Sequence, residues 1–217
     1  MGERKTYHRG RRKKKKGGII STLILIIAIA VFCVSGYQLY KIFGGYHQGK
    51  SEYDKVREVA VHGDDKDEDE FVVDFDELKK INADTVGWIR FYPEPSQISY
   101  PLVQTTDNDL YLNRTFSANE NTVGAIFVNC DNASDFSDRN TIIYGHRMRD
   151  HSMFHDLEKY KDESFWKENP YFYIYTPDGR KLTCHIYSAG IVKDTSSTYL
   201  TQFASDEEYQ AFLDDTK

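Results

Sequence analysis

An uncharged, mostly aliphatic run from Ile19 to Tyr40 constrains this 217-residue chain more than any other feature. About twenty apolar residues cross the hydrocarbon core of a membrane as a helix, so a single anchor is predicted within residues 19–43. A dense basic block, Arg9–Lys16 (RGRRKKKK), precedes the run. Basic residues beside such a helix stay in the cytoplasm, which places the N-terminus inside and the remaining chain on the outer face of the cell membrane. The block therefore indicates a membrane partner and no nucleic-acid partner.

Two kinds of processing compete with an intact, single-pass anchor. Ala28-Ile-Ala30 has the small residues of a signal-peptide cleavage site. The apolar run continues well beyond Ala30, however, and this favours an uncleaved helix. Lipid attachment at Cys33 is disfavoured, because the bulky Phe32 stands where a small residue is expected. A thiol that faces lipid or packs against a helix is the better interpretation of Cys33.

Charge and glycine patterns divide the chain into four parts. Glycines at 44, 45 and 49 are expected to break the helix, and Asp64–Glu70 (DDKDEDE) is a like-charged cluster that repels itself and stays hydrated. A calcium site there is disfavoured, because the glycine turn and ligand spacing of an EF-hand are missing. The predicted parts are a basic cytoplasmic tail (1–18), a transmembrane anchor (19–43), an acidic extracellular linker (44–73) and a folded domain (74–217).

The folded domain shows the pattern of an α+β protein with a mainly antiparallel sheet or barrel and peripheral helices. Asp74 followed by Glu77, and Ser205 followed by Glu208, predict two capped helix starts. Met153 to Tyr160 and Asp162 to Asn169 add helical segments between strands. Strands are predicted from β-branched and aromatic runs at 86–92, 98–104, 124–129, 141–144, 171–176 and 180–192.

One strand ends on a candidate catalytic residue. Thr141 to Tyr144 read as a buried strand, and Gly145 ends it, since glycine lets the backbone turn or approach another group closely. His146 then stands at the end of a rigid element, where reactive groups are often held. An imidazole can take or give a proton near neutral pH. One such histidine is weak evidence until its neighbours are known.

The three cysteines are scattered at positions 33, 130 and 184. Their spacing fits neither a disulfide framework nor a zinc site, so no metal is expected. Cys184 alternates with Leu182 and Ile186 on one strand face, which indicates a small buried side chain. No phosphate-binding loop or dinucleotide fingerprint occurs, and no cofactor is expected.

An ordered set of motifs in the domain resembles the class B sortases, which are cysteine transpeptidases of Gram-positive cell surfaces. The resemblance runs from about residue 74 to the end and rests on Asn82-Ala-Asp-Thr-Val-Gly-Trp-Ile89, Ile98-Ser-Tyr-Pro-Leu-Val-Gln104, Asp107-Asn-Asp-Leu-Tyr-Leu112, Gly124-Ala-Ile-Phe127, Ile142-Ile-Tyr-Gly-His146 and Met153-Phe154.

The resemblance implies an eight-stranded β-barrel with a cysteine, a histidine and an arginine at the active site. The partners implied are the sorting-signal peptide of a secreted protein and an amine of the cell-wall precursor, which are joined through a cysteine acyl-enzyme. His146 matches the family histidine. By the same resemblance, the peptide groove is expected around Asn108, Leu112, Tyr144, Thr195, Tyr199 and Leu200, the last three within segment 195–200.

The chain departs from the family pattern in one respect. The family nucleophile lies in a Thr-Leu-x-Thr-Cys strand beyond the helix that starts at Ser205, and the arginine lies on the next strand, yet neither motif occurs up to Lys217. The chain is therefore expected to be truncated before its last two strands and inactive by itself. Two alternatives remain open: a Cys130–His146 dyad, and a non-catalytic fragment that binds peptides or partners.

Overall fold

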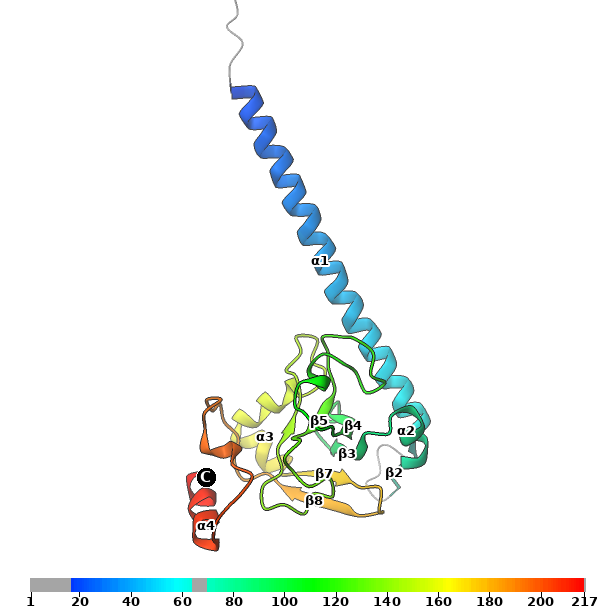
Figure 1. Ribbon diagram of the computed structural model, residues 1–217, viewed down its shortest axis with the longest axis vertical. Coiled ribbons are helices and arrows are strands. Elements are labelled where there is room, and N and C mark those ends of the chain that lie inside the picture. The colour runs from blue at the N-terminus through cyan, green and yellow to red at the C-terminus, as the bar shows by residue number, and fades with distance from the viewer. Residues whose placement is uncertain (1–16, 64–69, 217) are drawn as a thin grey trace, which may run out of the picture. The chain divides into compact units, whose positions relative to one another are not determined.

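A computed structural model describes residues 17–63 and 70–216 of the chain. The basic tail up to residue 16 and the acidic run 64–69 lie outside the described residues, so the expectations for them stay predictions. The chain forms two compact units, Met1–Gly44 and Gly45–Lys217. The second unit carries the sheet, and Figure 1 labels its elements.

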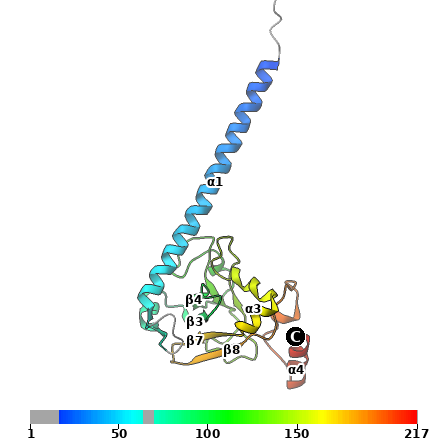
Figure 2. The same cartoon turned by 180° about the vertical axis from the view of Figure 1, so that it is seen from behind.

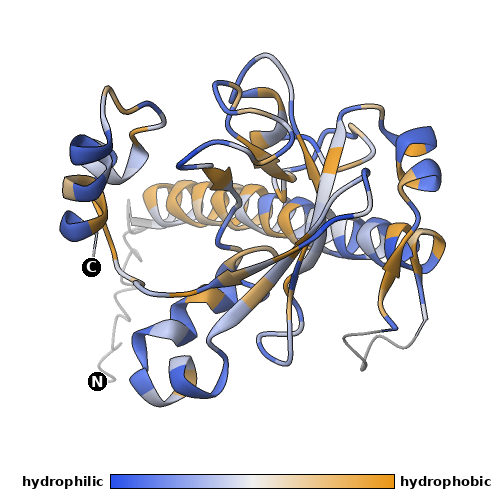
Figure 3. Ribbon diagram, turned by 90° about the horizontal axis from the view of Figure 1, so that it is seen from below, coloured by the Kyte–Doolittle hydropathy of each residue, from blue (hydrophilic) through white to orange (hydrophobic). Residues whose placement is uncertain are grey.

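Helix α1 runs from Gly17 to Ala60 without interruption (Figure 1). Its side chains from Ile19 to Phe43 are exposed, and they are numerous and apolar enough for the helix to cross a membrane. Figure 3 shows this apolar character as a long orange stretch of the helix. The sequence-based prediction of an apolar helix at residues 19–43 agrees with this.

The prediction that glycines at 44, 45 and 49 break the helix is wrong. A glycine costs about 1 kcal/mol in a helix interior, and the packing of the segment that follows outweighs this cost. Tyr53, Val56 and Ala60 are buried in the core of the second unit. A side chain at position 49 would lie only 3.0 Å from Val123. Residues 45–60 are therefore a helix packed within the domain rather than linker.

A six-stranded, curled sheet forms the centre of the second unit, in the order β6-β5-β4-β3-β7-β8. Neighbours are antiparallel except β4 and β5, which are parallel. The short strands β1 (Val61–His62) and β2 (Val72–Val73) pair separately. The strands of the large sheet are β3 (Thr85–Phe91), β4 (Ser99–Val103), β5 (Ile126–Val128), β6 (Ile143–Tyr144), β7 (Tyr171–Tyr175) and β8 (Lys181–His185).

All six predicted strands are present, but several are shorter than predicted: β5 is limited to Ile126–Val128 of 124–129, and β6 to Ile143–Tyr144 of 141–144. β8 ends at His185 rather than at residue 192, because its partner β7 begins at Tyr171, which lies opposite His185. Within the described residues, β6 and β8 each pair on one side only, so the sheet is an open half-barrel. Figure 2 shows β7 and β8 from behind, at one border of the sheet.

Helices lie around the sheet, and local caps start them as the sequence predicts. The Asp74 carboxylate accepts from the Glu77 N–H, and the Ser205 hydroxyl accepts from the Glu208 N–H. The helices are α2 (Phe75–Ile81), α3 (Glu163–Glu168) and α4 (Asp206–Asp215), and the shorter 3-10 segments are η1 (Leu110–Leu112), η2 (His155–Lys161) and η3 (Ser197–Tyr199). Helix α4 lies at the periphery of the domain in Figures 1 to 3.

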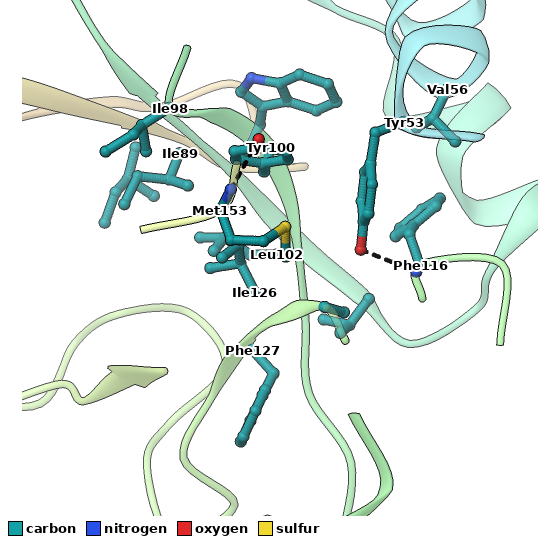
Figure 4. Packing of buried hydrophobic residues seen from close by; sticks show 14 of the residues in the cluster. Tyr53, Val56, Ile89, Ile98, Tyr100, Leu102, Phe116, Ile126, Phe127 and Met153 are labelled. Atoms are coloured by element: carbon teal, nitrogen blue, oxygen red, sulfur yellow. Dashed lines mark hydrogen bonds between the residues drawn. The ribbon is translucent and has the colours of Figure 1, made fainter. Parts of the chain in front are cut away.

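The core joins the C-terminal part of α1 to the inner strands (Figure 4). Tyr53 from α1 packs edge-on against Tyr100 of β4, with ring centroids 5.3 Å apart. The Tyr100 hydroxyl accepts from the Met153 N–H at 3.1 Å, and the Tyr53 hydroxyl accepts from the Phe116 N–H at 3.2 Å. These contacts hold the chain segments before β5 and after β6, which carry the candidate site.

Candidate active site

His146 directly follows β6. The residue before it, Gly145, packs so closely against its neighbours that no side chain would fit at that position. A Cβ at Gly145 would lie 2.4 Å from Ile126 and 2.6 Å from the ring of Phe154. The prediction that Gly145 permits a close approach is confirmed. The Phe154 N–H also donates to the His146 carbonyl at 2.9 Å. The backbone on both sides of the imidazole is therefore fixed.

The imidazole of His146 is half-buried and makes one hydrogen bond, from Nε2 to the Leu112 carbonyl oxygen at 2.7 Å. A carbonyl oxygen only accepts, so Nε2 carries the proton. In the neutral ring Nδ1 is then the atom with a free lone pair. Leu112 is among the residues predicted for the groove, and the structure brings its backbone, rather than its side chain, to the histidine.

The Leu112 carbonyl is positioned through the Asn82–Asp84 motif. The neighbouring Tyr111 hydroxyl donates to the Asp84 carboxylate at 2.8 Å and accepts from the Asn82 amide at 2.6 Å. Burial is the main reason that the pKa of Tyr111 is raised to about 12, so this phenol stays protonated and can donate. These two bonds fix η1, and with it the acceptor of the histidine proton.

Gly124 makes the contact between η1 and His146 sterically possible. Its backbone has φ +66°, and a Cβ there would lie 2.8 Å from the Tyr111 oxygen and 2.9 Å from both the Leu112 oxygen and the His146 ring. Side chains rarely adopt this conformation and do not approach other atoms so closely. The Gly124 carbonyl in turn accepts from the Tyr53 hydroxyl at 2.8 Å. Helix α1 thus supports the backbone against which the histidine packs.

A second group of polar side chains lies further along β6. The Tyr144 ring packs on Phe127, and its hydroxyl is 3.4 Å from the Asn129 amide nitrogen. Asn129 also accepts from the Asn108 amide at 3.2 Å. Burial raises the pKa of Tyr144, and the nearby Tyr199 acts in the same direction. The predicted residues Asn108 and Tyr144 are therefore linked through Asn129.

The segment predicted to wall the groove is held beside the start of β6. The Asn140 amide donates to the Leu200 carbonyl at 2.7 Å and to the Thr198 carbonyl at 3.1 Å. Tyr199 and Leu200 remain 41% and 45% exposed, so their side chains are available to a ligand. Thr195 is exposed, and in the described residues its side chain makes no hydrogen bond. Its place in the groove stays a prediction.

None of the cysteines is hydrogen-bonded to His146 in the described part of the chain. Phe127 pairs with Tyr144 and Val128 with Ile143, so His146 continues this register beside residue 125. Cys130 is five residues further along, or about 16 Å at the rise of an extended strand. Cys184 lies on β8, at the opposite border of the sheet, and burial raises its pKa. The strand pairing therefore argues against the Cys130–His146 dyad.

Comparison with known proteins identifies the family. No protein-family model matches the chain. Sortase B of Staphylococcus aureus is 30% identical over 196 residues, which cover 90% of this chain and 79% of that protein. The chain belongs to the sortase B family. Sortase B from B. anthracis, solved in complex with AAEK1, superposes with a TM-score of 0.67 at 31% identity, covering 81% of either chain.

A further similar structure is a sortase B in complex with its substrate. The Staphylococcus aureus sortase B–substrate complex is 35% identical to this chain, with a TM-score of 0.62. The similar region covers 66% of this sortase and 65% of that chain. These relatives support the α+β sortase fold and the transpeptidase class that the motifs indicated.

Three residues that shape this site in the sortase were not assigned a role from the sequence. Gly124 was only part of a motif, although a glycine directly before a buried strand is a signal for a close backbone approach. Asn129 and Asn140 both flank strands, and their amide side chains bond to backbone groups, of Asp131 and of Thr198 and Leu200 respectively. The partners of Asn140 lie in a chain segment that is distant in sequence.

We expect Gly124→Ala to destabilise this sortase more than Gly179→Ala. Both glycines have positive φ, +66° and +84°, but a Cβ at Gly179 meets nothing within 4 Å. Gly179→Ala should therefore cost only the backbone strain, about 1–2 kcal/mol. Gly124→Ala should add the clash with Leu112 and His146, about 1–3 kcal/mol more. Urea unfolding of the detergent-solubilised chain measures the difference, and equal losses would contradict the close approach.

Proposed function

We propose that this sortase is a membrane-anchored transpeptidase in which His146 transfers protons through Nδ1. The observation that carries the proposal is the bond from Nε2 to the Leu112 carbonyl, which leaves Nδ1 as the basic atom. A sortase-type transpeptidase needs a proton-transferring group in both steps, because the leaving amine must gain a proton and the incoming amine must lose one.

The proposed reaction has two steps that share one acyl-enzyme. A thiolate attacks the carbonyl carbon of the scissile peptide bond, and protonated His146 gives its Nδ1 proton to the leaving amine as the C–N bond breaks. The product is a thioester. An incoming cell-wall amine then attacks the thioester, and His146 takes the amine proton while the thiolate leaves. A new amide bond forms, and thiolate and imidazolium are restored.

The peptide site that we propose runs along β6, between η1 and η3. His146 and the Leu112 backbone lie near one end of this strand, and Tyr144 points its hydroxyl toward Asn129 near the other. The flanking residues are those predicted from the resemblance: Asn108, Leu112, Tyr144, Thr195, Tyr199 and Leu200. A Staphylococcus aureus sortase B crystallised with its substrate supports a peptide ligand for this fold.

The thiolate is the one reactant that the described residues do not present to His146. Cys130 lies at the far end of the β5–β6 pair, Cys184 lies on β8, and Cys33 lies in the apolar part of α1. This favours the second candidate function for residues 1–217 taken alone, namely peptide binding without catalysis. Turnover then requires a Thr-Leu-x-Thr-Cys strand of the family type.

We expect purified residues 1–217 to bind a sorting-signal peptide without cleaving it. Cys130→Ala should change neither property. A chain that also carries the family cysteine and arginine strands should cleave the peptide, and His146→Ala in that chain should lower the rate about 10²–10⁴-fold. The measurement is fluorescence of a quenched peptide, with His185→Ala as a matched control, since His185 is an exposed histidine at the other border of the sheet. Turnover by residues 1–217 that Cys130→Ala abolishes would contradict the proposal.

We also propose that α1 anchors the protein with its N-terminus in the cytoplasm and the domain on the outer face. The exposed apolar side chains of α1 and the preceding basic block support this orientation. Protease added to intact protoplasts should remove the domain and leave the basic tail protected. A protected domain would show that the orientation is the reverse.

A further inference from the structure

A cluster of two histidines and one aspartate lies just beyond the candidate active site. The loop from Arg147 to Met153 is closed by pairing of these two residues and by the bond between the Phe154 N–H and the His146 carbonyl. His151 lies in this loop, and two further members of the cluster, His155 and Asp156, begin η2. One potential ligand atom from each of the three residues lies within 4.8 Å of the others.

His155 has an unusual environment for a histidine that serves only structure. Its side chain is 8% exposed, and its Nδ1 is buried without a hydrogen-bond partner in the described residues. Nε2 lies 3.3 Å from a Glu158 carboxylate oxygen. A carboxylate this close favours the proton on Nε2, and the neutral ring then has its lone pair on Nδ1. Histidines that bind metals typically donate their other N–H to a carboxylate in this way.

Asp156 supplies a buried, charged oxygen to the same cluster. Its side chain is 4% exposed, and its Oδ1 lies 3.1 Å from His151 Nδ1. Lys159 contacts the other carboxylate oxygen, Oδ2, at 2.8 Å. A metal at Oδ1 would therefore leave the Lys159 contact in place.

We propose that His151, His155 and Asp156 form a binding site for one zinc ion. Two imidazole nitrogens and one carboxylate oxygen suit zinc, whereas calcium and magnesium prefer sets composed of oxygen. Cysteine spacing does not predict this site, because its potential ligands follow the pattern His151-x-x-x-His155-Asp156 and include no cysteine.

The three ligands need only a small movement to meet the metal. Zinc–ligand distances of about 2.0–2.2 Å place ligand atoms of a tetrahedral site about 3.5 Å apart. His151 has a side chain that is 66% exposed and can swing inward, while Asp156 and His155 are already held by packing. Water would complete the fourth position. Bound zinc would tie the loop that begins at the catalytic histidine to η2, an effect separate from the proposed transpeptidation.

The test is zinc binding by the untagged full chain in detergent, measured by competition with a chromophoric chelator. We expect one zinc ion per chain, unaffected by excess calcium. His151→Ala should weaken binding about 100-fold or more, since it removes one of three protein ligands from a four-coordinate site. Glu158→Gln should weaken it about 10–100-fold, the usual effect of losing the partner of a ligating histidine.

Two control variants separate this site from other zinc ligands. His62→Ala alters an exposed histidine that also lies near a carboxylate, 3.9 Å from Asp74, but has no third ligand. Cys130→Ser removes a partly exposed thiol. Both should bind zinc as the unaltered chain does. An absence of stoichiometric zinc, or equal affinity in His151→Ala and in the unaltered chain, would overturn the proposal and leave the cluster as an ion-pair network.

Discussion

The close approach of the Gly124 backbone to the Leu112 carbonyl and the His146 ring is the contact on which the candidate site depends. Only a residue without a side chain fits there at φ +66°. The Gly124 backbone is also held by α1, because the Gly124 carbonyl accepts a hydrogen bond from the Tyr53 hydroxyl. One backbone segment therefore contacts Tyr53 of α1, η1 and the imidazole of His146.

This arrangement determines which atom of His146 is chemically available. The Leu112 carbonyl is an obligate acceptor, so it selects the ring form with the proton on Nε2. Backbone groups are suited to this task, because a carbonyl fixed by η1 neither titrates nor changes rotamer. Further along β6, Asn129 links Tyr144 and Asn108. His146 directly follows β6 and Tyr144 is on it, so this strand fixes the spacing between the histidine and the polar group around Tyr144.

The sequence predicts the features that depend on neighbouring residues. The caps at Asp74 and Ser205 and the order of the strands follow from local patterns, and the ordered motifs indicate the sortase fold. Prediction from the sequence fails where contacts between segments that are distant in the chain determine the local structure. Packing of Tyr53 and Val56 keeps α1 helical through its glycines, and strand register separates Cys130 from His146. The His155 Nδ1, which is buried without a hydrogen-bond partner among the described residues, is likewise a feature of the folded chain alone.

The protonation state of His146 tests the central claim most directly. The seven histidines of the chain can be observed in two-bond ¹H–¹⁵N spectra of the detergent-solubilised protein, and His146→Gln identifies the signal. At a pH where the ring is neutral, the proton should reside on Nε2, with Nδ1 showing the shift of an unprotonated nitrogen. A proton found on Nδ1 would contradict the account, since Nε2 could not then donate to Leu112.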